Sequence, residues 1–359
     1  MPVVRTTVGG RPAYRWGQSG KAYPYTQGDL ESARRARGQA EAQGRAARAR
    51  GSRGDAQPVV AGQVRLPDHL EKRYRRILLR RTRLARDLVK RKLSPVLRQA
   101  KKSEREERAD GLDEYVGELG VDIAAVAAAI EAVAPIDEDE LRDLAIAVER
   151  WATKQIERSL QQVVPTIQVF TDQTVAIYEA FIAENVALIQ SMDARYFADL
   201  ERLVQDVFRE GTTTDEFVRE LQRRFEVSES RARLIGRDQI SKINAQVTEH
   251  RQTELGIDEY QWTTAGDERV TGAPGGLYPD ERPSHYALDG QFFKWSDPPI
   301  AGRSGQPAHP GQAIQCRCVA RAVISPEQRA RLAREQAARE AAEAAAQTSV
   351  VGAPGRFQG

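Results

Sequence analysis

The chain has 359 residues and a mass of 40.0 kDa, which predicts two or three folded units joined by linkers rather than one compact domain. Aromatic residues make up only 6% of a chain rich in alanine and arginine, which favours a mainly helical protein over a β-sandwich or a large α/β enzyme. The net charge of +3 hides an uneven distribution, because residues 1–108 carry +18 and residues 109–359 carry −15.

Residues 1–67 predict a basic, disordered arm. Gly, Pro and Gln interrupt this segment, and the stretch from Asp29 to Arg50, which can form a transient helix, offers no apolar stripe to bury. Such an arm suits a polyanion, and because it has no base-reading motif we expect it to bind DNA phosphates independently of base sequence. The candidate nucleic-acid-binding residues are Arg34, Arg35, Arg37, Arg45, Arg48 and Arg50.

Aromatic residues in the same arm have two interpretations. They either stack on single-stranded bases or form a docking peptide for a protein partner. The residues concerned are Tyr14, Trp16, Tyr23 and Tyr25.

Residues 68–210 predict an extended helical body. The first helix starts at Asp68, its apolar residues recur at three- and four-residue steps, and most of its polar positions are arginine or lysine. This basic face either pairs with acidic helices of the same chain, such as residues 137–140, or binds another molecule. Further helices are predicted at residues 121–133, 141–160, 170–192 and 195–210.

Residues 211–325 are predicted to form a small α+β module. Residues 326–359 are predicted to form a tail that is part helix and part disordered. Two helices, at 216–225 and 228–254, precede Gly/Pro-rich loops and three short strands. The strands are predicted at residues 260–263, 291–295 and 316–323. The fold class is therefore mainly α, with a small α+β module near the C-terminus.

Several classes of protein are excluded. No apolar run approaches the roughly 18 residues needed to cross a bilayer, and the N-terminus lacks the apolar core of a signal peptide, so we expect a protein of the cytoplasm with no membrane partner. Two cysteines exclude a disulfide scaffold. The sequence also lacks the glycine loops of the Rossmann and P-loop folds.

The two cysteines carry a metal hypothesis. Cys316 and Cys318 are too close in sequence for an ordinary disulfide and well spaced to share a metal. A small module with few core residues often needs a structural metal for stability. With His285, and with His309 as a weaker candidate, they match the donors of one structural zinc ion. Alternatively, the cysteines are ordinary small residues on one face of a strand.

Four sequence blocks give the module a specific resemblance. They comprise a helix with Arg237 and Asn244, a strand with Trp262 that leads into Asp267-x-Arg269, the stretch from Arg282 to Gly290 with His285 and Asp289, and a closing Cys316-Arg317-Cys318 block. In order and chemistry the blocks resemble the C-terminal module of the phage Mu F-like minor head proteins, the head-morphogenesis family of tailed phages.

The chain departs from the family pattern at two places. Residues 271–281 form an extra Gly/Pro-rich loop between the Asp-x-Arg block and the histidine block, and Gln315 stands where the family commonly has asparagine. The longer loop matters little if the blocks are structural, but it matters if Arg269 and His285 act together in catalysis.

The resemblance implies a minor capsid component of the virion, located in the head interior or at the portal vertex and present in the host cytoplasm during assembly. Its implied partners are the portal protein and the major capsid or scaffold protein, and it implies a role in DNA packaging or ejection rather than catalysis. One alternative is a metal-dependent hydrolase or toxin-related enzyme in which Asp267 or Asp289 acts as base. Another alternative is a host DNA-binding factor that acts through the arm alone. This alternative does not explain why the C-terminal sequence blocks are present.

Overall fold

The computed structural model describes residues 3–17, 21–49, 57–105, 116–169, 175–210 and 213–351. Helices account for 61% of the structure, which also contains two small antiparallel sheets, and this confirms the mainly α fold class. The chain forms two compact units, and each is discontinuous in sequence. We call them the bundle unit (Pro67–Val148 and Thr174–Ile243) and the sheet unit (Met1–Leu66, Glu149–Gln173 and Asn244–Gly359).

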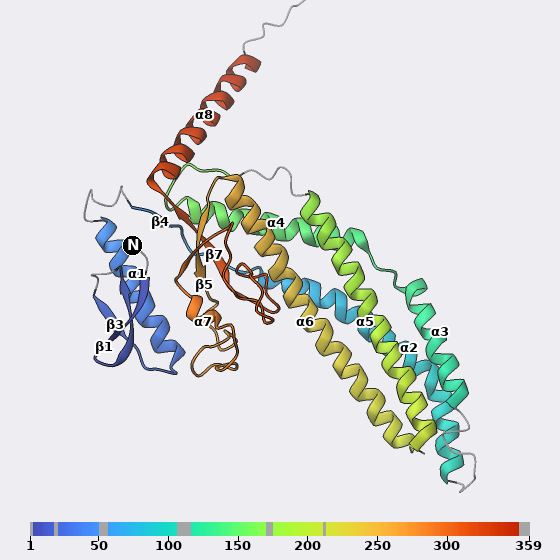
Figure 1. Cartoon of the computed structure of the whole chain (residues 1–359). Coiled ribbons are helices and arrows are strands. Elements are labelled where there is room, and N and C mark those ends of the chain that lie inside the picture. The colour runs from blue at the N-terminus through green and yellow to red at the C-terminus, as the bar shows by residue number, and fades with distance from the viewer. Residues whose placement is uncertain are drawn as a thin grey trace, which may run out of the picture. The chain divides into compact units, whose positions relative to one another are not determined.

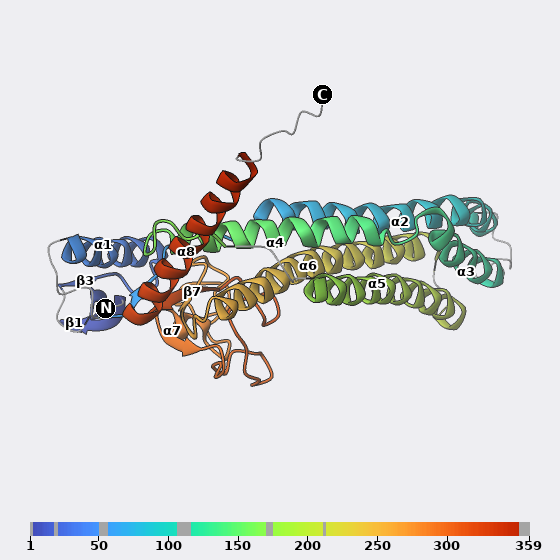
Figure 2. The same ribbon diagram turned by 90° about the horizontal axis from the view of Figure 1, so that it is seen from above.

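The bundle unit is built from long helices that lie side by side (Figures 1 and 2). They are α2 (Asp68–Arg105), α3 (Val116–Val133), the first part of α4 (Glu138–Leu160), α5 (Val175–Glu210) and the first part of α6 (Thr214–Glu254). Their apolar faces meet in one core in which Leu93, Ile123, Leu200 and Phe217 are almost fully buried. Helical periodicity in the sequence therefore corresponds to packing between helices, as expected.

Arg81 is a charged residue on the apolar side of α2. Its side chain is only 8% exposed, and its Nε donates a hydrogen bond to Asp193 at 2.6 Å while other guanidinium nitrogens bond Glu131 and the carbonyl of Ala134. Because every partner lies elsewhere in the unit, this arginine ties α2 to α3 and α5 instead of interrupting the core.

Two pairs of predicted helices are continuous in the structure. Helix α5 runs through residues 192–195, and α6 runs through residues 225–228, because neither junction contains the Gly or Pro that ends a helix. Thr213 and Glu216 form a reciprocal cap at the start of α6. The Thr213 N–H donates to the Glu216 carboxylate at 3.0 Å, and the Glu216 N–H donates to the Thr213 hydroxyl at 3.3 Å.

The sheet unit contains a four-stranded antiparallel sheet in the order β4-β7-β5-β6. Its strands are β4 (Val59–Val60), β5 (Glu259–Thr263), β6 (Phe292–Lys294) and β7 (Val319–Ile324). All three strands predicted for the module are therefore present, although the last begins after the two cysteines. The one-turn helix α7 (His285–Leu288) lies between β5 and β6, and α8 (Pro326–Val351) follows β7.

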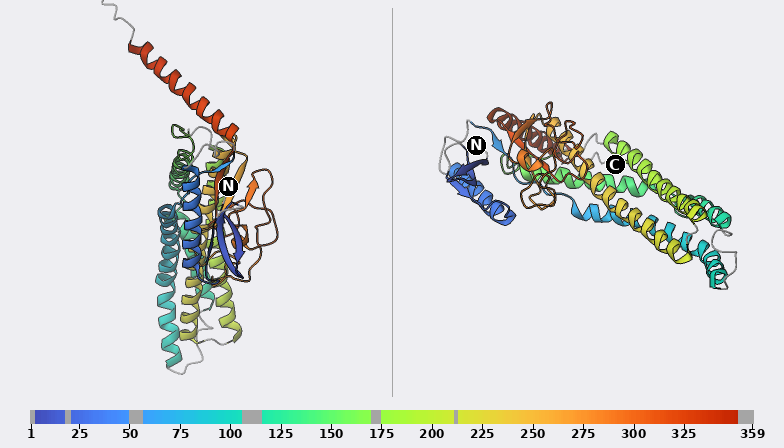
Figure 3. Two further views of the ribbon diagram at one scale, coloured as in Figure 1. Left: turned by 90° about the vertical axis from the view of Figure 1, so that its left-hand side faces the viewer. Right: turned by 60° about the horizontal axis from the view of Figure 1, so that its bottom comes forward.

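The N-terminal segment differs from the predicted unstructured arm. Strands β1 (Val3–Val8), β2 (Arg11–Trp16) and β3 (Ala22–Pro24) form an antiparallel meander, and α1 (Leu30–Ala49) packs on it (Figures 1 and 3). Tyr14 and Tyr25 stack with ring centroids 5.2 Å apart over the small residues Ala33, Ala36 and Ala40. Four aromatic residues that the sequence offered as a docking or stacking surface thus contribute instead to a small core, together with the alanines of α1.

Within the described ranges, no helix combines the length and the apolar character that crossing a bilayer requires.

Candidate metal centre

Three potential metal ligands come from two places in the sheet unit. His285 opens α7, where the Ser284 side chain caps the turn by accepting a hydrogen bond from the Ala287 N–H at 3.1 Å. Cys316 and Cys318 immediately precede β7, whose residue Val319 pairs with Thr263 of β5. Gln315, with a φ of 56°, makes the turn that brings the cysteine block back to the sheet.

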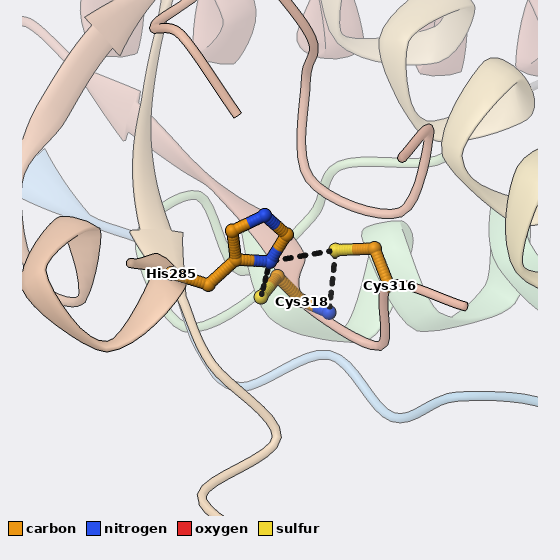
Figure 4. Close-up of side chains that lie close together, drawn as sticks. All are labelled: His285, Cys316 and Cys318. Atoms are coloured by element: carbon orange, nitrogen blue, oxygen red, sulfur yellow. Dashed lines mark hydrogen bonds between the residues drawn. The ribbon is translucent and has the colours of Figure 1, made fainter. Parts of the chain in front are cut away.

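The three side chains converge on one point. Their ligand atoms all lie within 4.8 Å of one another, and each residue is buried. The Nδ1 of His285 lies 3.5 Å from the Cys316 sulfur and 3.7 Å from the Cys318 sulfur, so the same ring nitrogen faces both thiols (Figure 4). Two sulfurs and an imidazole nitrogen at this spacing can hold a metal ion.

The other ring nitrogen of His285 defines its tautomer. Nε2 lies 2.8 Å from the carbonyl oxygen of Ala301, and because a carbonyl can only accept, Nε2 must carry the proton. Nδ1 is then the nitrogen left to face the sulfurs. A histidine that binds a metal through one nitrogen and donates from the other to a backbone carbonyl is the usual arrangement around protein metals, so the group fits a metal ion.

The two thiols differ in acidity. A hydrogen bond from Cys318, helped by His285, lowers the pKa of Cys316 even though burial opposes this, and the amides of Gly311 and Cys318 point at its sulfur from 3.3 and 3.5 Å. Burial raises the pKa of Cys318, and the neighbouring Cys316 raises it further. For His285, burial lowers the pKa but the hydrogen bond to Cys316 and the charge of its sulfur more than compensate, so that the pKa is raised.

An apolar shell closes the centre. Trp262 is fully buried and meets the His285 ring edge-on, with centroids 5.3 Å apart and planes at 72°. Tyr260, Trp295 and Ala320 belong to the same buried cluster as the two cysteines. Desolvation at such a site makes an unpaired thiolate costly, and a divalent cation would stabilise the ionised form of both thiols.

The structure does not bring His309 into this group. Its Nδ1 lies 2.9 Å from the Tyr260 hydroxyl, and its Nε2 lies 3.8 Å from the carboxylate of Glu249. Burial lowers the pKa of His309. The ring is therefore a buried packing partner of Tyr260 and Trp295, and the described residues supply three donors rather than four.

The two acidic residues that the hydrolase alternative offers as base are engaged in ion pairs. Asp267 pairs with Arg317, between the two cysteines, at 2.8 Å, and its carboxylate also accepts from the Arg269 N–H at 3.1 Å. The Arg269 side chain is exposed. Asp289 accepts from Arg37 at 2.6 Å and from the Thr264 N–H at 2.8 Å. Both carboxylates are therefore engaged by contacts within the fold.

The remaining sequence-predicted module residues lie outside the metal group. Asn244 is buried in α6, and Arg237 lies within the bundle unit, 3.7 Å from Glu71. Gly290 donates its N–H to the Trp262 carbonyl at 2.8 Å with a φ of +82°, and a Cβ added there would lie 3.2 Å from the carbonyl oxygen of Val3. Glycine therefore allows β1 to approach closely.

The predicted nucleic-acid-binding arginines divide into three groups. Arg34 donates from Nε to the Gly266 carbonyl at 2.7 Å, and Arg37 pairs with Asp289 and with Glu41. Arg35 is exposed. The side chains of Arg45 and Arg48, and all of Arg50, lie outside the described residues.

The N-terminal segment contacts the module through Arg5 and Tyr286, which are not among the site residues predicted from the sequence. The guanidinium of Arg5 lies over the Tyr286 ring at 3.7 Å, donates to the Tyr286 carbonyl, and reaches Asp289 at 3.5 Å. The Tyr25 and Tyr286 hydroxyls lie 2.9 Å apart. These pairs are separated by more than 260 residues, so no local pattern in the sequence could have indicated them.

Comparison with known proteins identifies the module. The family model described as "Phage Mu protein F like protein" matches residues 198–321, from the last turns of α5 to within β7. Residues 198–321 are a phage Mu protein F-like domain. Its family is a structural phage protein family and not an enzyme family. The buried His285, Cys316 and Cys318 group lies inside this domain.

One curated relative also matches. An uncharacterised protein of Haemophilus influenzae is 34% identical over 140 residues, which is 39% of this chain and 28% of the relative. The match thus spans just over a quarter of that protein's length. No solved structure shows a significant match.

Proposed function

We propose that this chain is a minor head protein of a tailed phage, which associates with the portal protein during procapsid assembly and assists DNA packaging or ejection. The observation that carries the proposal is the phage Mu protein F-like domain at residues 198–321. The major capsid or scaffold protein is a second partner in this proposal, and the virion is the location.

In this role the metal centre is a structural staple for the domain. One zinc ion would be held by Nδ1 of His285 and the sulfurs of Cys316 and Cys318, and it would join the segment around α7 to the start of β7. A small unit with few buried residues gains much of its folding free energy from such a bond.

The hydrolase alternative has one observation in its favour, since three protein donors leave a fourth coordination position for water. The surroundings of the centre argue against it. The three ligand residues are only 4–7% exposed. The two acidic residues offered as base, Asp267 and Asp289, are each paired with arginine. A general base needs a free carboxylate within reach of the water that it activates.

Incorporation into heads tests the proposal. In the genome that encodes this chain, the gene is inactivated, and particles are purified from complemented and uncomplemented lysates. We expect the protein in particles from the complemented lysate, at few copies per head, and a loss of infectious, DNA-filled heads without it. A normal yield of infectious particles without the gene, or particles devoid of the protein, would refute the proposal.

A further inference from the structure

Helix α2 presents a strongly basic surface. Between Lys72 and Lys102 the sequence contains fourteen lysine and arginine residues and a single acidic residue, Asp87. We define the basic face of α2 as the members of this set that share its outer side. They are Lys72, Arg73, Arg76, Arg80, Arg83, Lys90, Arg91, Arg98 and Lys101.

These residues lie on one side because of their spacing. Steps of three, four and seven residues keep side chains on one side of an α-helix, and the opposite side of α2 holds the buried residues Leu78, Ala85, Val89 and Leu93. The basic face spans 30 residues from Lys72 to Lys101, and the 29 steps between them at 1.5 Å per residue amount to about 44 Å along the helix.

Pairing within the chain accounts for only part of this charge. Arg80 pairs with Glu140 at 2.7 Å, Arg83 with Glu229 at 2.9 Å, and Lys101 with Asp215. Among the contacts of the described residues, five exposed members of the face have no ion pair. They are Lys72, Arg76, Lys90, Arg91 and Arg98.

The chemistry of the face favours a uniform, linear polyanion over a protein. A protein partner would need apolar anchors at the centre of the contact, yet none of the exposed large apolar side chains of the described chain lies on α2. Duplex DNA presents one phosphate charge per about 1.7 Å of axis, so about 44 Å of basic face runs beside about 13 base pairs.

We propose that the basic face of α2 is a binding surface for duplex DNA, which contacts phosphates without reading bases. The inference rests on the proposed head function only for the identity of the polyanion, and it assigns DNA contact to α2 instead of the N-terminal arginines. Two of those, Arg34 and Arg37, are already engaged by Gly266 and Asp289.

The test measures how salt affects DNA binding by the full chain. A fluorescent 24-base-pair duplex is titrated with protein at several salt concentrations between 50 and 300 mM, and anisotropy gives the dissociation constant. The helix variant carries Lys72→Gln, Arg76→Gln, Lys90→Gln, Arg91→Gln and Arg98→Gln, which retain helix propensity. Since each phosphate contact contributes about 0.9 to the slope of log K against log salt, we expect the slope to fall by about 4 and the affinity at 100 mM salt by at least about 100-fold.

A matched control removes the same charge from exposed arginines of the sheet unit. It carries Arg11→Gln, Arg150→Gln, Arg158→Gln, Arg269→Gln and Arg334→Gln. We expect it to keep a slope within about one unit of the wild type. Equal losses in the two variants would show an effect of net charge alone and overturn the assignment to α2, and so would a helix variant that binds like wild type. Circular dichroism of both variants verifies that the helices remain folded.

Failure of this inference is separable from failure of the head function. A wild-type chain that binds no duplex at 50 mM salt overturns the DNA surface and points to an acidic protein as the occupant of the face, while incorporation into heads stays a separate measurement. Absence of the protein from heads, with DNA binding intact, would refute the head function and leave the surface on α2.

Discussion

Removal of the Asp289 carboxylate should detach the N-terminal meander and α1 from the Mu F-like domain. The side chain is 3% exposed, it accepts hydrogen bonds from Arg37 at 2.6 Å and from the Thr264 N–H at 2.8 Å, and it forms an ion pair with Arg5 at 3.5 Å. Asp289→Ala deprives Arg5 and Arg37 of the carboxylate that they share, in a largely buried setting. The two arginine contacts span more than 250 residues of sequence, so their loss acts on tertiary docking and not on a local turn.

The expected magnitude follows from burial. Loss of one partner of a buried ion pair costs about 3–5 kcal/mol, and hydrogen bonds to charged groups contribute about 1.5–3 kcal/mol each. Water reaches Arg37 and Arg5, whose side chains are 18% and 23% exposed, which places the cost at the lower end. We expect Asp289→Ala to destabilise the sheet unit by about 3 kcal/mol, roughly a 100-fold change in its unfolding equilibrium. Asp289→Asn, which keeps an acceptor for Thr264, should have a smaller effect.

Tryptophan fluorescence during urea unfolding isolates the relevant unit, because all four tryptophans (Trp16, Trp151, Trp262 and Trp295) lie in the sheet unit. Glu41→Gln is the matched control. It removes a carboxylate 3.2 Å from the same Arg37 but one turn away on α1, so it should cost about 0.5 kcal/mol or less. Equal shifts for the Asp289 and Glu41 variants, or a shift below about 1 kcal/mol for Asp289→Ala, would refute the reasoning.

Three further predictions concern the metal, a buried ion pair and pH. Metal analysis of the full chain should find close to one zinc per chain, and Cys318→Ser should abolish zinc binding. Removal of the zinc by a chelator should expose both thiols to a thiol reagent. A metal-free chain whose thiols remain protected would contradict the structural role of the metal. Glu149→Gln should destabilise the sheet unit by about 3 kcal/mol in the fluorescence assay, because the Arg251 and Glu149 side chains are 0% and 2% exposed and lie 2.9 Å apart. Lys154→Gln, at an exposed position of the same helix, is the control and should leave the free energy of unfolding unchanged. Equal shifts for the two variants would disprove the contribution of the buried pair. The Thr213 N–H lowers the pKa of Glu216 below its ordinary 4.5, so the cap's contribution to stability is complete above that value and is lost as the pH falls through the lowered pKa. Glu216→Gln removes the titrating carboxylate, so its helicity measured from pH 6 to 3 should depend less on pH than that of wild type, and an identical profile would argue against the cap.

Much of the fold could be predicted from local patterns. The apolar spacing of α2 and the capping residues Thr213 and Glu216 define helices through contacts within a few residues, which sequence displays directly. The three short strands of the module were predicted from residue composition in the same way. Local patterns failed at the junctions inside α5 and α6, because polar residues without Gly or Pro do not end a helix that tertiary packing supports.

The candidate metal centre was predictable in part. The spacing of Cys316 and Cys318 and the block that contains His285 indicated these three residues, but no sequence pattern could show whether His309 joins them in space. That choice depends on the hydrogen bonds of each ring. His285 donates to the Ala301 carbonyl and turns Nδ1 to the sulfurs, whereas His309 bonds the Tyr260 hydroxyl.

The sequence by itself determined the mainly helical class, the concentration of positive charge in the first 108 residues and the Mu F-like blocks, because each of these is a property of residue type and spacing. Only the tertiary structure decided how that positive charge is used. Arg37 is drawn to Asp289, 252 residues away, and Arg81 is buried against Asp193, while Lys90 and Arg91 remain exposed on α2. Charges attract according to distance in space and not in sequence, so the division between arginines paired within the fold and basic residues left exposed on α2 appears only once the chain is folded.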